Sequence, residues 1–455
     1  MAHIITVYSK YVIVLFLYLF LGASFLAHFK NSTKKQKKYA LFQAIFLFCM
    51  QFAAYLTIVI RTQRAEYLIF YLFLQILTML LPEMAAYIYP GMSRVLLNQM
   101  SLLLAVGMIL MTRLDMDKAV RQLLIAAAAF VISLFIPAIM KSFRFLSKLG
   151  WIYVAVGIAA LSAVLILGQV THGSKISYTI AGITFQPSEL IKITYVFFLA
   201  AFLGKSARFG QIFLSGVLAA IHVLVLVFSR DLGSALIYFV TYVLLITIAS
   251  HKFIYLPLGA AGCAGACAVA YKFFSHVQVR VQAWKDPWSV IDDQGYQITQ
   301  SLFAMSRGGL FGLGIGKGTP QDIPFVETDF IFAAMTEEMG ILFSAGVIGV
   351  SILCFLNMVK LAGGLTDGFY KFLAAGFAML YLFQIFLTVG GGTKFIPLTG
   401  VTLPFISYGG SSVMTSIFMF AVIQGIYTLR YREEERIARQ RKKAKEGVSP
   451  EEMEG

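Results

Sequence analysis

Long apolar runs recur along most of the chain, and they constrain its fold more than any other feature. Each run is roughly 17–25 residues long, the length that a helix needs to cross the hydrocarbon core of a bilayer. With 59% hydrophobic and 13% charged residues, the composition excludes an ordinary soluble domain. The runs are continuous rather than alternating, which excludes a membrane β-barrel. We therefore predict an all-α, polytopic membrane helix bundle.

Run length predicts about thirteen membrane spans. The first run lacks the small-residue cleavage site of a signal peptide, and too many runs follow it for such a peptide to explain it. A long loop at residues 275–327 separates the tenth span from the eleventh. The spans are expected near residues 11–28, 40–61, 66–90, 98–112, 119–140, 149–169, 188–204, 210–228, 233–250, 253–274, 328–357, 370–390 and 404–428.

Lysine and arginine concentrate in short loops and in the tail, which predicts the side on which each loop lies. An odd number of spans puts the N-terminus and the loops 170–187 and 275–327 outside. The net charge of +15 then reflects orientation and anionic lipid headgroups, and no nucleic-acid partner is expected. The tail at 431–455 carries both signs of charge and should extend a cytoplasmic helix, with no partner needed to explain it. The segments expected on the cytoplasmic side are 30–38, 141–148, 205–208, 251–252 and the tail.

An acidic residue, Asp329, lies where the long polar loop meets an apolar run, in the segment TDFIFAAMTEE at 328–338. Thr328 is a good N-cap residue, so we predict a helix start there with Asp329 in its first turn. The helix dipole and first-turn N–H groups would keep this carboxylate ionised. An ionised carboxylate at a boundary between water and lipid suits a general base or a cation ligand. Helix capping alone explains the pattern about equally well.

Eleven residues of the outer loop, GGLFGLGIGKG at 308–318, are dense in glycine. Glycine permits close backbone approach and exposes N–H groups, as anion-binding loops require. Lys317 is followed by Gly318 rather than by Ser or Thr, which excludes a Walker A motif, and no strand precedes the run as a dinucleotide-binding fingerprint requires. A flexible loop is the alternative of equal weight.

Several charged residues lie at membrane depth. Glu189 and Lys192 are three residues apart at the start of a span, close enough to pair, and a structural ion pair is the favoured interpretation. Glu337 and Glu338 lie about two helical turns beyond Asp329, where packing into a polar bundle interior is at least as well supported as chemistry. The cysteines match no zinc spacing, so no metal site is predicted.

A last polar patch, KFIPLTGVTLPFISYGGSS, occupies residues 394–412. Pro404 and the glycines after it loosen a helix, and Ser411 and Ser412 supply hydrogen-bond donors. Broken helices at membrane depth occur where the backbone lines a cavity. We therefore expect a cavity between this patch and Asp329.

Five motifs closely resemble, in order, those of the SEDS (shape, elongation, division and sporulation) family, typified by FtsW and RodA. The resemblance extends over residues 98–430 and implies a ten-span catalytic core. It divides the chain into an extra three-span module at 1–95, a catalytic membrane domain at 96–430 and a charged tail at 431–455. The motifs are FQPSEL at 185–190, DLGSA at 231–235, GYQITQS at 295–301, TDFIF at 328–332 followed by Glu337–Glu338, and PFISYGGSS at 404–412.

The resemblance implies a peptidoglycan glycosyltransferase that polymerises lipid II at the outer face of the bacterial cytoplasmic membrane during cell division or elongation. It implies an inverting reaction, a class B penicillin-binding transpeptidase as partner, and Asp329 as the catalytic residue. Arg280 and Lys192 match further residues of the family's motifs. We place them in the substrate site together with Glu189, Lys317, Gln297, Ser411 and Ser412.

Lipid II polymerisation needs a base, which we assign to Asp329, and positive charge at the departing pyrophosphate. Arg280 supplies that charge, with Lys317 or Mg²⁺ as further candidates, and no cofactor is expected to be required. Two other interpretations stay open. Many spans and broken helices also suit a lipid II flippase, and the basic tail and extra spans suit a non-enzymatic scaffold for a transpeptidase.

Overall fold

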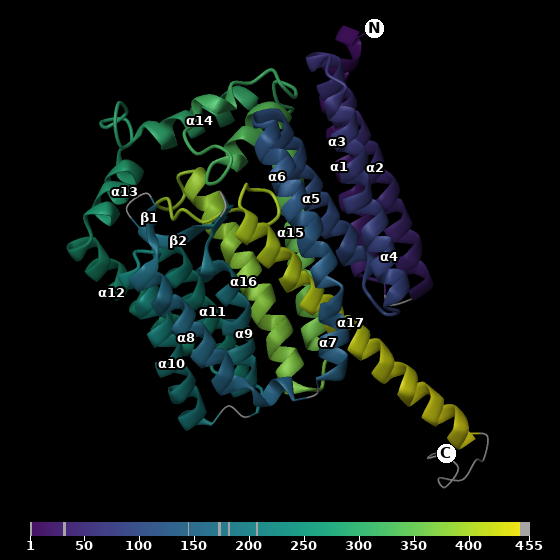
Figure 1. Cartoon of the computed structure of the whole chain (residues 1–455), viewed down its shortest axis with the longest axis vertical. Helices are drawn as coiled ribbons and strands as arrows, with labels where there is room; N and C mark the ends of the chain where they lie inside the picture. The colour runs from purple at the N-terminus through teal and green to yellow at the C-terminus, as the bar shows by residue number, and fades with distance from the viewer. Residues whose placement is uncertain are drawn as a thin grey trace.

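The computed structural model describes residues 2–30, 33–143, 145–171, 174–180, 183–205 and 208–445. Within them the protein is a bundle of long helices that run up and down side by side, with one small sheet (Figure 1). The predicted all-helical membrane bundle is confirmed.

Three crossings form the N-terminal part of the bundle. Helices α1 (Ala2–His28) and α2 (Thr33–Thr62) pack as an antiparallel pair. The third crossing begins as α3 (Glu66–Gln75), continues through a π-helical turn, η1 (Ile76–Leu80), and ends as α4 (Leu81–Ile88). Pro82 lies in the first turn of α4 and has no N–H to donate, which accounts for the widened turn before it.

The remaining crossings surround α5 (Arg94–Leu114), whose apolar window is entirely buried. At the opposite extreme, none of the apolar window of α12 (Tyr255–Phe273) is buried, so α12 lies at the edge of the bundle. The other helices are α6 (Met116–Ser133), α7 (Phe135–Ser142), the 3-10 turn η2 (Leu146–Lys148), α8 (Gly150–Leu167), α9 (Pro187–Leu203), α10 (Phe209–Phe228), α11 (Leu232–Ser250), α13 (Ser275–Lys285), α14 (Tyr296–Gly308), the 3-10 turn η3 (Pro320–Asp322), α15 (Ile331–Gly363), α16 (Gly368–Gly392) and α17 (Gly410–Lys445).

In the described part of the chain, twelve helical segments are long and apolar enough to cross a membrane, with α3–α4 and α6–α7 each counted as one. Helix α9 has 17 residues and joins the sheet end of α8 to the opposite end of the bundle, where α10 begins. Adding α9 to the twelve gives the thirteen crossings that run length indicates.

One small element was not predicted. The loop at 170–187 contains an antiparallel sheet in the order β1 (Gln169–Thr171), β2 (Ser174–Ile180) and β3 (Ile183–Phe185). Tyr178 pairs with Phe185 at the β2–β3 edge. In β2 the apolar residues Ile176, Tyr178 and Ile180 alternate with polar residues, which is a strand pattern, so the prediction of a loop at 170–187 without strands missed an available signal.

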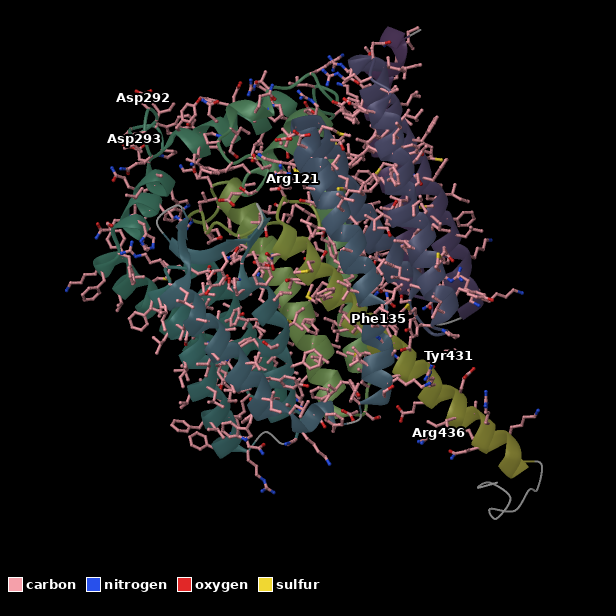
Figure 2. The ribbon with its side chains drawn as sticks, in the orientation of Figure 1. Arg121, Phe135, Asp292, Asp293, Tyr431 and Arg436 are labelled. Atoms are coloured by element: carbon pink, nitrogen blue, oxygen red, sulfur yellow. The ribbon has the colours of Figure 1, made fainter. Side chains whose placement is uncertain are left out.

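The two ends of the bundle differ in what they carry. The N-terminus, the sheet and α14 lie at one end, whereas the extended end of α17 projects from the other (Figure 1). Asp292 and Asp293 mark the first end, and Tyr431 and Arg436 lie on the projecting part of α17 (Figure 2). The end with the outer loop is called the loop end below.

Candidate active site

Asp329 lies in a turn just before α15, at the loop end of the bundle. The helix begins at Ile331, and Phe330 occupies the N-cap position without a side-chain cap. The prediction that Thr328 caps the helix is therefore wrong, because the Thr328 hydroxyl donates instead to the carbonyl of Phe325 at 3.1 Å. Asp329 is half-buried and precedes the first residue of the helix.

A second loop fixes the backbone on either side of this turn. The N–H of Tyr408 donates to the carbonyl of Glu327 at 2.7 Å, and the hydroxyl of Ser407 donates to the carbonyl of Thr328 at 2.6 Å. These bonds tie the turn to the loop between α16 and α17. If α15 began at 328, as predicted, these carbonyls would have to accept bonds from the first turns of the helix. They bond to the second loop instead, which explains why α15 begins later than predicted.

Arg280 approaches the same place from α13. Its guanidinium donates to the carbonyl of Leu398 at 3.3 Å. A Cβ placed on Gly400 would lie 3.7 Å from Arg280 Nη2 and 3.9 Å from Asp329 Oδ2. Gly400 has a φ of 72°, which favours glycine, and its bare Cα leaves room between the two charged groups. The structure thus brings two predicted site residues to one glycine.

The loop between α16 and α17 is the polar patch predicted at 394–412, but the last helix starts at Gly410 rather than at 404. Neighbouring side chains bond to its backbone, as irregular backbone at membrane depth requires: Gln384 Nε2 donates to the carbonyl of Thr402 at 3.0 Å, and Gln122 Oε1 accepts from the N–H of Gly409 at 3.1 Å. Ser411 Oγ accepts a bond from the N–H of Gln186 at 2.9 Å, and Ser412 Oγ lies 2.7 Å from Thr402 Oγ1. Both predicted serines therefore contact this chain's own groups.

Glu189 and Lys192 form the ion pair that their spacing predicts, at 2.6 Å, and both side chains are buried. Lys192 also donates to Gln384 Oε1 at 3.3 Å, and Gln384 Nε2 donates to the carbonyl of Thr402 at 3.0 Å. Gln384 connects the buried pair to the loop between α16 and α17. Sequence reasoning missed Gln384, because its partner Lys192 is 192 residues away.

Asp231 and His276 complete the polar surroundings. Asp231 caps α11 and accepts a bond from Ser188 Oγ at 2.9 Å, which holds the FQPSEL motif against α11. His276, one turn before Arg280 on α13, has a pKa lowered by burial and by the positive charges of Arg280 and Arg230. Positive charge therefore gathers at the loop end beside Asp329, which suits an anionic ligand. Gln297 is half-buried on α14.

The glycine-rich loop at 308–318 packs into a break in α15. The helix is interrupted at Gly340, with a φ of 88° and a ψ of 165°. The N–H groups of Leu313 and Gly314 donate to the carbonyls of Glu337 and Glu338 at 2.9 and 2.8 Å. The predicted close backbone approach is confirmed, but these two N–H groups serve the helix and not an anion.

Glu337 and Glu338 are buried on either side of this loop, each paired with an arginine. Glu337 lies 3.1 Å from Arg307 of α14, and Glu338 lies 3.0 Å from Arg113 of α5. Their predicted packing into a polar interior is confirmed. Lys317 is exposed. The glycines on either side of it, Gly316 and Gly318, lie beside Arg113 and Glu337 rather than beside Gly400.

The family model described as a cell cycle protein, which covers FtsW, RodA and SpoVE, matches residues 92–432. This chain belongs to the FtsW/RodA/SpoVE family. The family is the SEDS family whose motifs the sequence resembles, and the match begins just before α5, so helices α1–α4 lie outside it.

Curated relatives of this SEDS protein include peptidoglycan glycosyltransferase RodA of Mycobacterium tuberculosis (strain ATCC 25618 / H37Rv), which is 33% identical over 369 residues, covering 74% of this chain and 78% of the relative. Stage V sporulation protein E of Bacillus subtilis (strain 168) is 30% identical over 322 residues, covering 68% of this chain and 86% of that one.

Solved structures share the fold. A structure described as the structural coordination of polymerization and crosslinking by a peptidoglycan synthase complex matches with a TM-score of 0.64 at 23% identity, covering 75% of this chain and 99% of that one. The crystal structure of the rod shape determining protein RodA of Thermus thermophilus matches with a TM-score of 0.57 at 23% identity, covering 74% and 96%.

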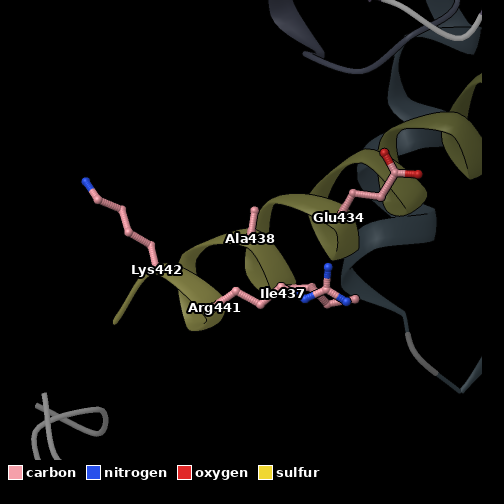
Figure 3. A pocket seen from close by; sticks show the side chains of 5 residues that line it. All are labelled: Glu434, Ile437, Ala438, Arg441 and Lys442. Atoms are coloured by element: carbon pink, nitrogen blue, oxygen red, sulfur yellow. The ribbon is translucent and has the colours of Figure 1, made fainter. Parts of the chain in front are cut away.

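A surface hollow of this SEDS protein lies on the projecting part of α17, away from the loop end that carries Asp329. It has a volume of about 580 Å³ and is lined by residues of α17 alone, at the end that projects from the bundle (Figure 3). Two of its five side chains are cationic, one is acidic and two are apolar: Arg441, Lys442, Glu434, Ile437 and Ala438. One face of a single helix offers no enclosed site, so the hollow is not the catalytic centre.

Proposed function

We propose that this protein is a peptidoglycan glycosyltransferase that polymerises lipid II into glycan strands. Family membership and the names of the curated relatives support the reaction class. One observation carries the assignment of the site: the carboxylate of Asp329 and the guanidinium of Arg280 both face Gly400. A base beside a fixed cation is what glycosyl transfer from a pyrophosphate-linked sugar requires.

In the proposed reaction, Asp329 takes the proton from the 4-hydroxyl of the acceptor sugar. The hydroxyl oxygen forms a bond to the anomeric carbon of the donor, and the bond from that carbon to the pyrophosphate oxygen breaks. The electron pair leaves on undecaprenyl pyrophosphate, whose charge Arg280 stabilises. Attack opposite to the leaving group inverts the anomeric centre. The half-burial of Asp329 supports this role, because a base must be reachable by its substrate.

The other predicted substrate contacts have separate parts in this proposal. Lys192 and Glu189 are buried and paired, so they act by holding the loop between α16 and α17 through Gln384. Ser411 and Ser412 hold that loop as well. Gln297 and Lys317 remain predictions as direct contacts to the sugar or the pyrophosphate.

The proposed mechanism does not require Mg²⁺, which stays a candidate for additional positive charge at the departing pyrophosphate. Among the described residues there is no group of three or more His, Cys, Asp or Glu side chains that could hold a metal ion. Mg²⁺ is usually bound through one or two carboxylates together with substrate phosphates. Asp329 offers one carboxylate, so Mg²⁺ would enter only with the pyrophosphate of the substrate. Polymerisation in EDTA compared with added Mg²⁺ tests this point.

The proposal places the protein in the bacterial cytoplasmic membrane, with the loop end and the N-terminus outside and α17 projecting into the cytoplasm. The distribution of basic residues supports this orientation, as does the placement of the N-terminus and α17 at opposite ends. It also includes a class B penicillin-binding transpeptidase as partner, which the resemblance of the fold to a chain of a peptidoglycan synthase complex supports.

The decisive experiment measures glycan polymerisation from purified lipid II in detergent. The native chain and its Asp329→Ala variant are compared, alone and with candidate class B transpeptidases. Polymer from the native chain and none from the variant is the expected result. Equal polymer from both would remove Asp329 from the mechanism. If no pairing yields polymer, a transbilayer assay with lipid II in vesicles decides between the flippase and the scaffold.

A further inference from the structure

Helix α1 runs along α15, the helix that follows Asp329. The hydroxyl of Tyr18 donates to the carbonyl of Leu342 at 3.1 Å, just past the break at Gly340. Further along, a Cβ on Gly346 would lie only 2.7 Å from Leu17 Cδ2, so the two helices approach closely there. The N-terminal module therefore packs directly on the helix that carries the catalytic end.

The same module reaches the glycine-rich loop at the loop end. Lys10 Nζ of α1 donates to the carbonyl of Gly312 at 2.7 Å. Arg61 Nη1 of α2 donates to the carbonyl of Ile315 at 2.8 Å. Hydrogen bonds from charged donors are stronger than neutral ones. Two cations from helices outside the family match thus hold two carbonyls of one loop.

This loop has little freedom to move without moving α15. A Cβ on Gly312 would lie 2.3 Å from the carbonyl oxygen of Glu338, and one on Gly340 would lie 2.4 Å from the N–H nitrogen of Gly312. The loop and the broken helix therefore touch backbone to backbone. A glycine-rich segment loses much conformational entropy when ordered, so external contacts are needed to keep it in one conformation.

We propose that α1 and α2 act as a brace for the active site, with Lys10 and Arg61 as positioning residues for glycosyl transfer. They hold the loop at 308–318 in the break of α15, and the outer half of α15 in turn sets the position of Asp329. Only the expected effect on the rate of polymerisation rests on the proposed function. The contacts between the brace and the loop stand without it.

The test uses the full chain with the double substitution Lys10→Met and Arg61→Met, which removes both charged donors and keeps an unbranched apolar stem at each position. We expect kcat for polymerisation to fall roughly tenfold with KM within about twofold, since a displacement of about 1 Å can cost a hundredfold in rate. Lys10→Arg with Arg61→Lys should retain most of the activity. Arg64→Met is the matched control, because Arg64 is exposed and pairs with Glu66 at 3.3 Å instead of with the loop. Native kcat in the double variant would overturn the proposal.

A second measurement separates positioning from a loss of folding. The rings of Tyr11 and Phe311 lie 5.0 Å apart, one on α1 and one in the loop. In a chain whose four native cysteines are replaced, Tyr11→Cys and Phe311→Cys joined by a short thiol crosslinker should restore kcat to the double variant. A loss of kcat that the crosslink does not restore would overturn the positioning role.

Hydrogen exchange at the amides of Leu313 and Gly314 gives a readout independent of activity. Both donate to α15 in the native chain, so both should exchange at least tenfold faster in the double variant. If the native chain makes no polymer, the proposed function fails, and faster exchange would still support the brace. Unchanged exchange would refute the brace whatever the activity.

Discussion

Two carboxylates at the loop end of α15 are each near an arginine, and they differ in almost every other respect. Glu338 is 1% exposed and pairs with Arg113 at 3.0 Å inside the bundle. Asp329 is half-buried in a turn before the helix, across Gly400 from the exposed Arg280. The comparison indicates that burial, rather than the presence of an arginine, separates an acid that holds the fold from one that a substrate can reach.

Substitution of Glu338 and substitution of Asp329 should affect different properties of the protein. Breaking a buried pair leaves an uncompensated charge in a medium that solvates it poorly, so the folded state suffers. When an acid that water reaches is replaced by a neutral residue, the folded state loses little stability. The proton transfer that the acid could perform is lost instead. Substitutions should therefore lower stability at Glu338 and activity at Asp329.

The largest expected effect is on activity at Asp329. Asp329→Asn keeps the shape of the side chain and removes the base, and we expect polymerisation to fall about 10³-fold, equivalent to about 4 kcal/mol of barrier. The midpoint of thermal unfolding in detergent should stay within a few degrees of the native value. A variant that keeps its rate, or that unfolds early, would contradict the distinction between the two acids.

The next effect is on stability at Glu338. Glu338→Ala removes the carboxylate partner of Arg113, whose side chain is 23% exposed and still donates to the carbonyl of Gly318, and we expect a loss of about 1–3 kcal/mol in the free energy of unfolding. Urea or thermal unfolding in detergent measures it. The double variant Arg113→Met with Glu338→Leu should regain most of that loss, because no unpaired charge remains.

A matched exposed pair provides the control for Glu338. Arg430 and Glu434 lie 2.8 Å apart on α17, with side chains 37% and 61% exposed. Glu434→Ala should change the free energy of unfolding by about 0.2–1 kcal/mol at most. A loss at Glu434 as large as that at Glu338 would show that burial is not what distinguishes the pairs.

A smaller effect on rate is expected at Arg280. Arg280→Ala removes one cation beside the departing pyrophosphate, and we expect kcat to fall roughly 10- to 100-fold with the fold intact. Arg280→Lys should recover part of the rate, since it restores the charge but not the paired N–H groups. Initial rates on lipid II measure both variants, and an Arg280→Ala variant with native kcat would remove this residue from the proposed mechanism.

Features that depend on residues close together in the sequence could be predicted, whereas features that depend on distant residues could not. The spans and the Glu189–Lys192 pair were predictable because run length and i, i+3 spacing are local properties. The start of α15 was not, because Tyr408 and Ser407 hold the turn before it from another part of the chain. The small sheet was predictable in part, because β2 alternates polar and apolar residues over 175–180.

Contacts between distant segments were equally hidden. The packing of the glycine-rich loop in the break of α15 depends on backbone bonds that no side-chain pattern reveals. The contact of the N-terminal helices with that loop joins residues 302 and 254 positions apart. A long loop rich in glycine beside buried acids was the available signal that the loop is packed rather than free.

The smallest expected effect concerns pH and sharpens the description of the half-buried site. Burial, and then the charges of Arg280 and Arg230, lower the pKa of His276 in the folded protein. The unfolded chain therefore binds this proton more readily, so the folded protein loses stability as pH falls below about 6.5 and through the lowered folded-state pKa.

In His276→Asn that contribution is absent, and the variant should gain stability relative to the native chain between pH 7.5 and 5.5. Thermal unfolding at the two pH values measures the difference, which is small because His276 is only half-buried. Parallel pH profiles for the two proteins would mean that neither burial nor the two arginines lower the pKa of His276 in the folded protein, which would remove one support for a cationic environment beside Asp329.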